Sequence, residues 1–91
     1  MVSNYGNKYA IDGVQQDSLT LTAGNTYIFD QSDSSNSGHP LRIYTDSSKS
    51  TEVTAGVTVS GSTTTFVHST TGTYSYQCAA HAGMGGDITV Q

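Results

Sequence analysis

Short stretches in which apolar and polar residues alternate recur along this sequence, separated by turn-forming residues. Leu19 and Leu21 are separated by one threonine, and Tyr74 and Tyr76 by one serine. Residues two apart point to the same side of an extended strand, so each pair shares one face. Strands are expected at Lys8–Ile11, Ser18–Thr22, Thr26–Asp30, Leu41–Thr45, Glu52–Val59, Thr63–His68, Thr73–Cys78 and Asp87–Val90. Because no window shows the 3.6-residue period of an amphipathic helix, the pattern predicts an all-β fold, a Greek-key sandwich or barrel of about eight short strands.

Composition and charge narrow the class of protein further. A chain of 91 residues is long enough for one domain, residues 1–91, and too short for two. The three Lys and Arg residues form no basic patch in the sequence, so nucleic-acid binding is not expected. The longest apolar run is far shorter than the roughly 20 residues that cross a bilayer, so no membrane span is predicted. The sequence MVSNYGNKYA at the N-terminus does not have the form of an export signal.

The loop before the last predicted strand contains the residues with the most distinctive chemistry. Its sequence places Cys78, His81 and Met84 at regular intervals of three, with only Ala and Gly between them. Soft sulfur ligands combined with imidazole select copper, and a blue-copper site uses one thiolate, two imidazoles and a weak axial thioether. The loop supplies three of these four groups. His39 is suited to supply the second imidazole, because it stands where a polar loop meets the fourth predicted strand.

Each of these residues has a simpler explanation when taken alone. Cys78 could be an inert buried thiol, Met84 a core residue that fills a gap, and His39 an ordinary loop residue. Their combination in one order and in a loop of small residues favours a metal site. His68 has no partner at ligand spacing and is predicted to be a histidine on the surface of a strand.

With these residues identified, the sequence resembles the cupredoxins, the small copper electron-transfer family that includes plastocyanin, amicyanin, azurin and pseudoazurin. The Cys-x2-His-x2-Met spacing is that of the amicyanin-type short loop. The Tyr-x-Cys before it and the Met-x-Gly-x-Ile-x-Val from Met84 onward match the C-terminal hairpin of the family. The resemblance implies that His39, Cys78, His81 and Met84 bind one copper ion, and that Gly38 could offer a distant backbone carbonyl.

Two features depart from the family, although the resemblance covers about residues 18–90. The family commonly has an asparagine after the first histidine, and this asparagine braces the cysteine loop by hydrogen bonding. Here the position is Pro40, which has no N–H, so the brace must come from another group or be missing. The chain is also short for the family. Similar short modules occur inside large proteins of marine bacteria and their phages, so the resemblance is also consistent with a fragment of a longer protein.

The resemblance further implies a monomeric carrier of single electrons and not an enzyme. Electrons would enter and leave through the exposed edge of His81, in an apolar patch where a redox protein docks. The patch is expected to consist of Ala79, Ala80, Ala82, Gly83, Gly85 and Gly86, with Pro40 and Leu41 at its rim. A periplasmic, secreted, surface-associated or virion-associated location is expected from the family.

An enzyme is the nearest alternative and is disfavoured by the sequence, whereas two further alternatives remain open. A multicopper oxidase or copper nitrite reductase needs additional histidines, and only His68 remains once two are assigned as ligands. A structural or interaction module of a larger protein could bind copper without passing electrons. A copper carrier or a zinc site is the third alternative, because one Cys with two His also satisfies zinc.

Overall fold

The computed structural model describes residues 1–81 and 83–91, and in this part the chain is all-β, with ten short strands in three sheets. One single-turn 3₁₀ helix, η1 (Ser34–Asn36), interrupts the strands. The strands are β1 (Val2–Tyr5), β2 (Lys8–Ile11), β3 (Val14–Gln15), β4 (Leu19–Leu21), β5 (Thr26–Asp30), β6 (Leu41–Tyr44), β7 (Val57–Ser60), β8 (Thr63–Val67), β9 (Gly72–Cys78) and β10 (Gly86–Val90). Among the described residues, no helix has the length and apolar character needed to cross a membrane.

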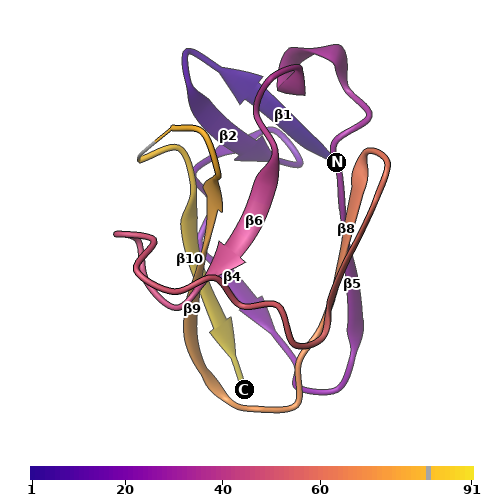
Figure 1. Cartoon of the computed structure of the whole chain (residues 1–91), viewed down its shortest axis with the longest axis vertical. Helices are drawn as coiled ribbons and strands as arrows, with labels where there is room; N and C mark the ends of the chain where they lie inside the picture. Colours follow the sequence, from indigo (N-terminus) through magenta and orange to yellow (C-terminus); the bar gives the residue numbers. More distant parts are fainter. Residues whose placement is uncertain (82) are drawn as a thin grey trace.

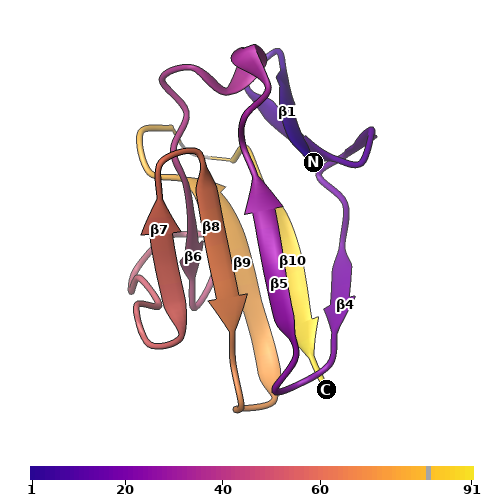
Figure 2. The same ribbon diagram turned by 90° about the vertical axis from the view of Figure 1, so that its right-hand side faces the viewer.

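Two larger sheets form the body of the molecule (Figures 1 and 2). One has the strand order β4-β10-β9-β6, in which β10 runs parallel to β4 and antiparallel to β9. The other has the order β5-β8-β7, and Figure 2 shows it lying in front of the first sheet. The small sheet β1-β2-β3 lies beside η1 at one end of the molecule, where the loop between β9 and β10 also lies (Figure 1).

The hydrophobic core lies between the two larger sheets. Phe29 of β5 and Phe66 of β8 enter it from one side, and Tyr76 of β9 and Ile88 of β10 enter it from the other. The rings of Phe29 and Tyr76 have centroids 6.0 Å apart, so the two sheets are in direct contact. The core continues towards the β9–β10 loop, because Cys78 belongs to the same buried cluster.

Most predicted strands are confirmed within one residue at each end, but the strand predicted at Glu52–Val59 is mostly wrong. Only its last three residues belong to β7. Gly56 has a φ of +74°, and Val57 N donates to Thr54 O at 3.1 Å, so a turn replaces the expected extended chain. The alternating Val and Thr residues favour a strand locally. The turn at Gly56 leads the chain into β7, however, so the strand starts only at Val57.

The strands β1 and β3 were not predicted. Both belong to tight hairpins with β2, and their turns have two successive residues at positive φ. Gly6 and Asn7 form the first turn, with φ of 53° and 60°, and Asp12 and Gly13 form the second, with φ of 50° and 87°. Hairpins with two-residue loops favour turns in which both central residues have positive φ, and Gly and Asn adopt such angles readily. The Gly6-Asn7 pair therefore indicates the β1–β2 hairpin in the sequence.

Candidate metal centre

The structure brings three of the four predicted ligands together at one end of the molecule. Cys78 is the last residue of β9, His81 lies in the loop that follows, and His39 lies just before β6. The possible ligand atoms of these three residues all lie within 4.8 Å of one another. The pairing of Leu41 with Cys78 in the β6–β9 register explains this arrangement, because it sets the chain before β6 beside the loop after β9.

Both imidazoles turn the same ring nitrogen towards the cysteine sulfur. Cys78 Sγ lies 3.5 Å from His81 Nδ1 and 3.9 Å from His39 Nδ1. An ion about 2.3 Å from sulfur and about 2.0 Å from nitrogen, with bond angles of about 110–120°, would separate the two donors by about 3.5–3.7 Å. The donor atoms therefore already have nearly the separation that binding one ion would require.

Burial changes steeply across this group of residues. Cys78 is fully buried, His39 is half-buried and His81 is exposed. Met84, the fourth predicted ligand, is also fully buried and belongs to the same core cluster as Cys78. The two sulfur-containing side chains are thus on the core side of the group, and an imidazole is on the solvent side.

The cysteine sulfur also accepts a hydrogen bond from the backbone. Ala80 N donates to Cys78 Sγ at 3.4 Å. A backbone N–H directed at a ligand sulfur tunes the potential of a metal bound there. The loop therefore places a backbone donor beside the candidate ligand sulfur.

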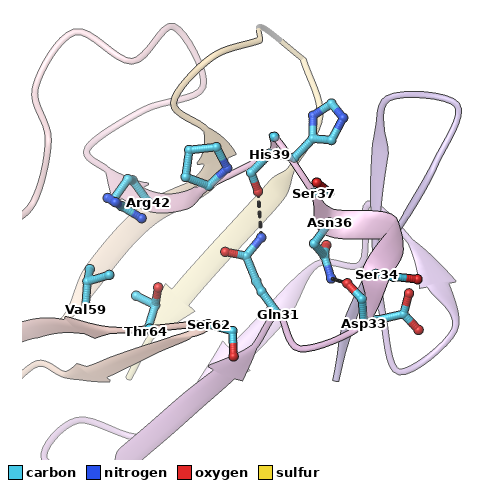
Figure 3. Close-up of a pocket in the computed structure, with 13 residues that line it drawn as sticks. Gln31, Asp33, Ser34, Asn36, Ser37, His39, Arg42, Val59, Ser62 and Thr64 are labelled. Carbon is cyan, nitrogen blue, oxygen red and sulfur yellow. Dashed lines mark hydrogen bonds between the residues drawn. The ribbon is translucent and has the colours of Figure 1, made fainter.

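Gln31, the residue after β5, braces the chain on both sides of Pro40. Its Nε2 donates to His39 O at 2.7 Å, and its Oε1 accepts from Leu41 N at 2.9 Å. Figure 3 shows the first of these bonds at the edge of an open cavity of about 520 Å³ lined by both residues. One side-chain amide thus holds the histidine segment, although the asparagine expected at position 40 is absent.

Two further contacts connect the histidine segment to its surroundings. Tyr9 OH donates to His39 O at 2.6 Å, and Ala79 N donates to Pro40 O at 2.9 Å. Burial, reinforced by the negative charge of Cys78, raises the pKa of Tyr9 well above its ordinary value, so the phenol remains protonated and can donate. The Ala79 bond joins the cysteine loop directly to the first histidine segment, which is the role that the missing asparagine would have had.

Replacing Gln31 with Leu should destabilise the metal-free protein by about 1–3 kcal/mol, because Leu41 N would lose its partner in a buried position. Urea denaturation measures this loss. Gln15→Leu is the matched control, since Gln15 is exposed at the end of β3 and should change stability little. Equal unfolding free energies for the wild-type protein and Gln31→Leu would show that the brace is not formed.

Side chains from β9 and from two distant residues, Lys8 and Gln16, also hold the far half of the ligand loop. Gln77 Oε1 accepts from Gly85 N at 3.1 Å, which closes the loop across its base. Gln16 Nε2 donates to the carbonyls of Gly83 and Gly85 at 3.1 and 3.0 Å, and Lys8 Nζ donates to that of Gly83 at 3.0 Å. No local spacing in the sequence indicates the contacts of Lys8 and Gln16, so these could not be predicted.

The surface around His81 is smaller than the predicted apolar patch. The exposed small residues beside it in the sequence are Ala79, Ala80 and Gly83. Leu41 and Gly85 are buried and do not contribute to the surface, whereas Pro40 and Gly86 are half-buried. Ala82 lies outside the described residues. A compact area of methyl groups and backbone therefore accompanies the exposed imidazole.

His68 lies apart from the candidate site. Its Nε2 is 2.9 Å from Tyr74 OH, and its ring stacks on Phe66 with centroids 5.5 Å apart. It is half-buried just after β8, so the predicted surface position is only partly correct. In residues 1–81 and 83–91, the only group of three or more His, Cys, Asp or Glu side chains that could hold a metal ion is that of His39, Cys78 and His81.

Comparison with known protein families, with characterised proteins and with solved structures finds no match for this chain. The donor atoms and their environment therefore carry the functional assignment. The chain is thus a small all-β protein with a possible metal site composed of His39, Cys78 and His81, with Met84 nearby.

Proposed function

We propose that this chain is a mononuclear type 1 copper protein of the cupredoxin kind that carries single electrons. His39, Cys78 and His81 would bind one copper ion, and Met84 would be a weaker fourth ligand. The observation that supports this most strongly is the fully buried cysteine sulfur, 3.5 and 3.9 Å from the nitrogens of two imidazoles, in a loop that also buries a methionine. A thiolate, two imidazoles and a thioether together are the donor set of blue-copper sites.

The arrangement of the sheets is compatible with this proposal. Two sheets face each other across one core, and the parallel pair β4–β10 brings the last strand beside an early one. We interpret this as a Greek-key sandwich of cupredoxin type, with β1-β2-β3 as an additional small sheet. In such a frame, one ligand precedes an edge strand while the others come from the final hairpin.

The residues around the site would keep the ligands in place during electron transfer. Bound copper would supply a one-electron couple. Hydrogen bonds to His39 O, to Pro40 O and to Cys78 Sγ fix the ligand segments without the ion, so a change in its charge needs little rearrangement of the chain. A small reorganisation of the ligands is what rapid electron transfer requires.

His81 is the proposed point of electron entry and exit, because it is the exposed member of the ligand set. The small residues beside it would let a redox protein approach the imidazole edge closely. A contact of this size suits weak and short-lived association. We propose no catalytic step, since the remaining histidine, His68, is engaged with Tyr74.

Voltammetry of the copper-loaded protein tests the carrier function. We expect a reversible one-electron couple, because both oxidation states would share one preformed ligand set. Zinc-loaded protein is the control and should show no couple in the same range. A copper-loaded protein whose reduction is irreversible, with loss of the metal, would contradict the carrier function and favour the binding-only module.

Zinc is the second candidate ion, because the separations between Cys78 and the two histidines fit a tetrahedral zinc site equally well. The buried Met84 favours copper, since a thioether is a soft ligand. Competition between Cu⁺ and Zn²⁺ distinguishes the two, and displacement of bound copper by equimolar zinc would overturn the choice of copper.

A further inference from the structure

Lys49 contacts the backbone of two proposed ligands at once. Its Nζ donates to Cys78 O at 3.0 Å and to His81 O at 3.1 Å. These carbonyls are three residues apart and belong to the turn that carries the thiolate and the exposed imidazole. Lys49 itself comes from the loop after β6, far from this turn in the sequence. A single ammonium group therefore bridges the two ends of the turn.

The loop that presents Lys49 is itself well organised. Asp46 Oδ1 accepts from Ser48 Oγ at 2.7 Å, and Asp46 Oδ2 accepts from Ser50 Oγ at 2.7 Å. These hydrogen bonds lower the pKa of Asp46, so the carboxylate stays charged and continues to accept. Thr45 N donates to Thr51 O at 3.0 Å across the base of the loop. The segment is thus a structured turn and not a loose connection.

The backbone of Lys49 is in an unfavourable conformation. Its φ of +60° lies in the left-handed region, which costs a residue with a Cβ about 1–2 kcal/mol relative to the usual helical region. Glycine would avoid this cost. Backbone strain that persists is a reason to look for a use of the side chain, and here the side chain ends at the candidate metal site.

We propose that Lys49 is a positioning residue for the metal site, an inference that rests on the proposed function. By bonding both carbonyls, it fixes the turn that sets the distance between Cys78 Sγ and His81 Nδ1. Its positive charge also favours the reduced site, because reduction adds one negative charge close to the ammonium. Among the described residues, Lys49 forms no ion pair with a carboxylate that would offset this charge.

Three variants test this role. Lys49→Gly removes the ammonium, which is destabilising, and relieves the backbone strain, which is stabilising, so the net change in the unfolding free energy should be small. Lys49→Arg keeps a charged donor and should restore much of the wild-type behaviour. Lys8→Gln is the matched control, since Lys8 also donates to a loop carbonyl, but to that of Gly83, which is not a proposed ligand.

The first measurement uses the metal-free protein. Amide hydrogen exchange at Ala79 and Ala80 should be about tenfold faster in Lys49→Gly, because both hydrogen bonds of the ammonium to the turn are lost. Exchange in the core of β9 should not change. The second measurement is the reduction potential of the copper-loaded protein, which should shift in the negative direction in Lys49→Gly, remain close to wild type in Lys49→Arg and shift by less in Lys8→Gln.

The outcomes separate this proposal from the proposed function. If the wild-type protein binds copper with strong visible absorption but Lys49→Gly has the same potential and the same exchange rates, the role of Lys49 is refuted and the copper site stands. A loss of global stability that accounts for all of the faster exchange would make Lys49 merely structural and would also refute the role. If the wild-type protein binds no copper at all, both proposals fail together.

Discussion

Replacing Cys78 with Ser should abolish the strong visible absorption of the copper-loaded protein. That absorption arises from charge transfer between a thiolate and a cupric ion, and a serine hydroxyl at this position would remain protonated. The substitution changes one atom at a fully buried site, and Ala80 N could still donate to the new oxygen. The fold should therefore persist, which circular dichroism of the metal-free variant would verify.

His68→Gln is the matched control for this experiment. His68 lies outside the ligand group and bonds Tyr74, so its replacement should leave the absorption spectrum unchanged. A Cys78→Ser protein that keeps its colour would exclude Cys78 as the copper ligand. Loss of colour in His68→Gln with a native fold would instead show that the ligand set has been assigned incorrectly.

Gly85→Ala should cause the largest loss of stability among the single substitutions considered for the loop. A Cβ at position 85 would lie 1.5 Å from Tyr76 O and 3.1 Å from the Tyr76 ring, and the backbone of a central strand cannot yield as a side chain can. Overpacking in a core typically costs about 1–3 kcal/mol and occasionally more, and we expect at least about 3 kcal/mol here. Urea denaturation of the metal-free protein measures the difference.

Gly83→Ala provides the comparison within the same loop. Its φ of +72° makes an added Cβ unfavourable, but the nearest atom is Lys8 Nζ at 4.0 Å, so no clash occurs. The expected loss is about 1–2 kcal/mol from the left-handed backbone alone. If Gly85→Ala proved no more damaging than Gly83→Ala, the close packing of the loop against β9, next to Met84, would be wrong.

The parts of the fold that could be predicted are those encoded by local alternation. Leu19–Leu21 and Gly86–Val90 are strands within one residue of the expected bounds, because their alternating apolar and polar residues already define which face is buried. Glu52–Val59 carries the same kind of pattern, but the turn at Gly56 depends on pairing between β7 and β8, which the local sequence does not reveal. Very short strands such as β3 are likewise defined by their partner and not by their own residues.

The candidate site could be predicted to the extent that its residues share one loop. Cys78, His81 and Met84 lie within seven residues, and the structure places the first two of them with His39 in one cluster. The supporting groups could not be predicted, because they are remote in sequence. Tyr9 reaches the ligand segments through one hydrogen bond, and Gln31 and Lys49 through two each. No spacing rule connects these residues with the residues that they hold.

Anomalous diffraction at the copper edge, from crystals of the copper-loaded protein, tests the metal site most directly. One peak is expected, within about 2.0–2.3 Å of His39 Nδ1, His81 Nδ1 and Cys78 Sγ, since these are typical metal–nitrogen and metal–sulfur distances. The same crystals would show whether the Met84 sulfur approaches the ion. A peak elsewhere on the molecule, or a His39 ring turned away from the Cys78 sulfur with no ion between them, would contradict the copper site.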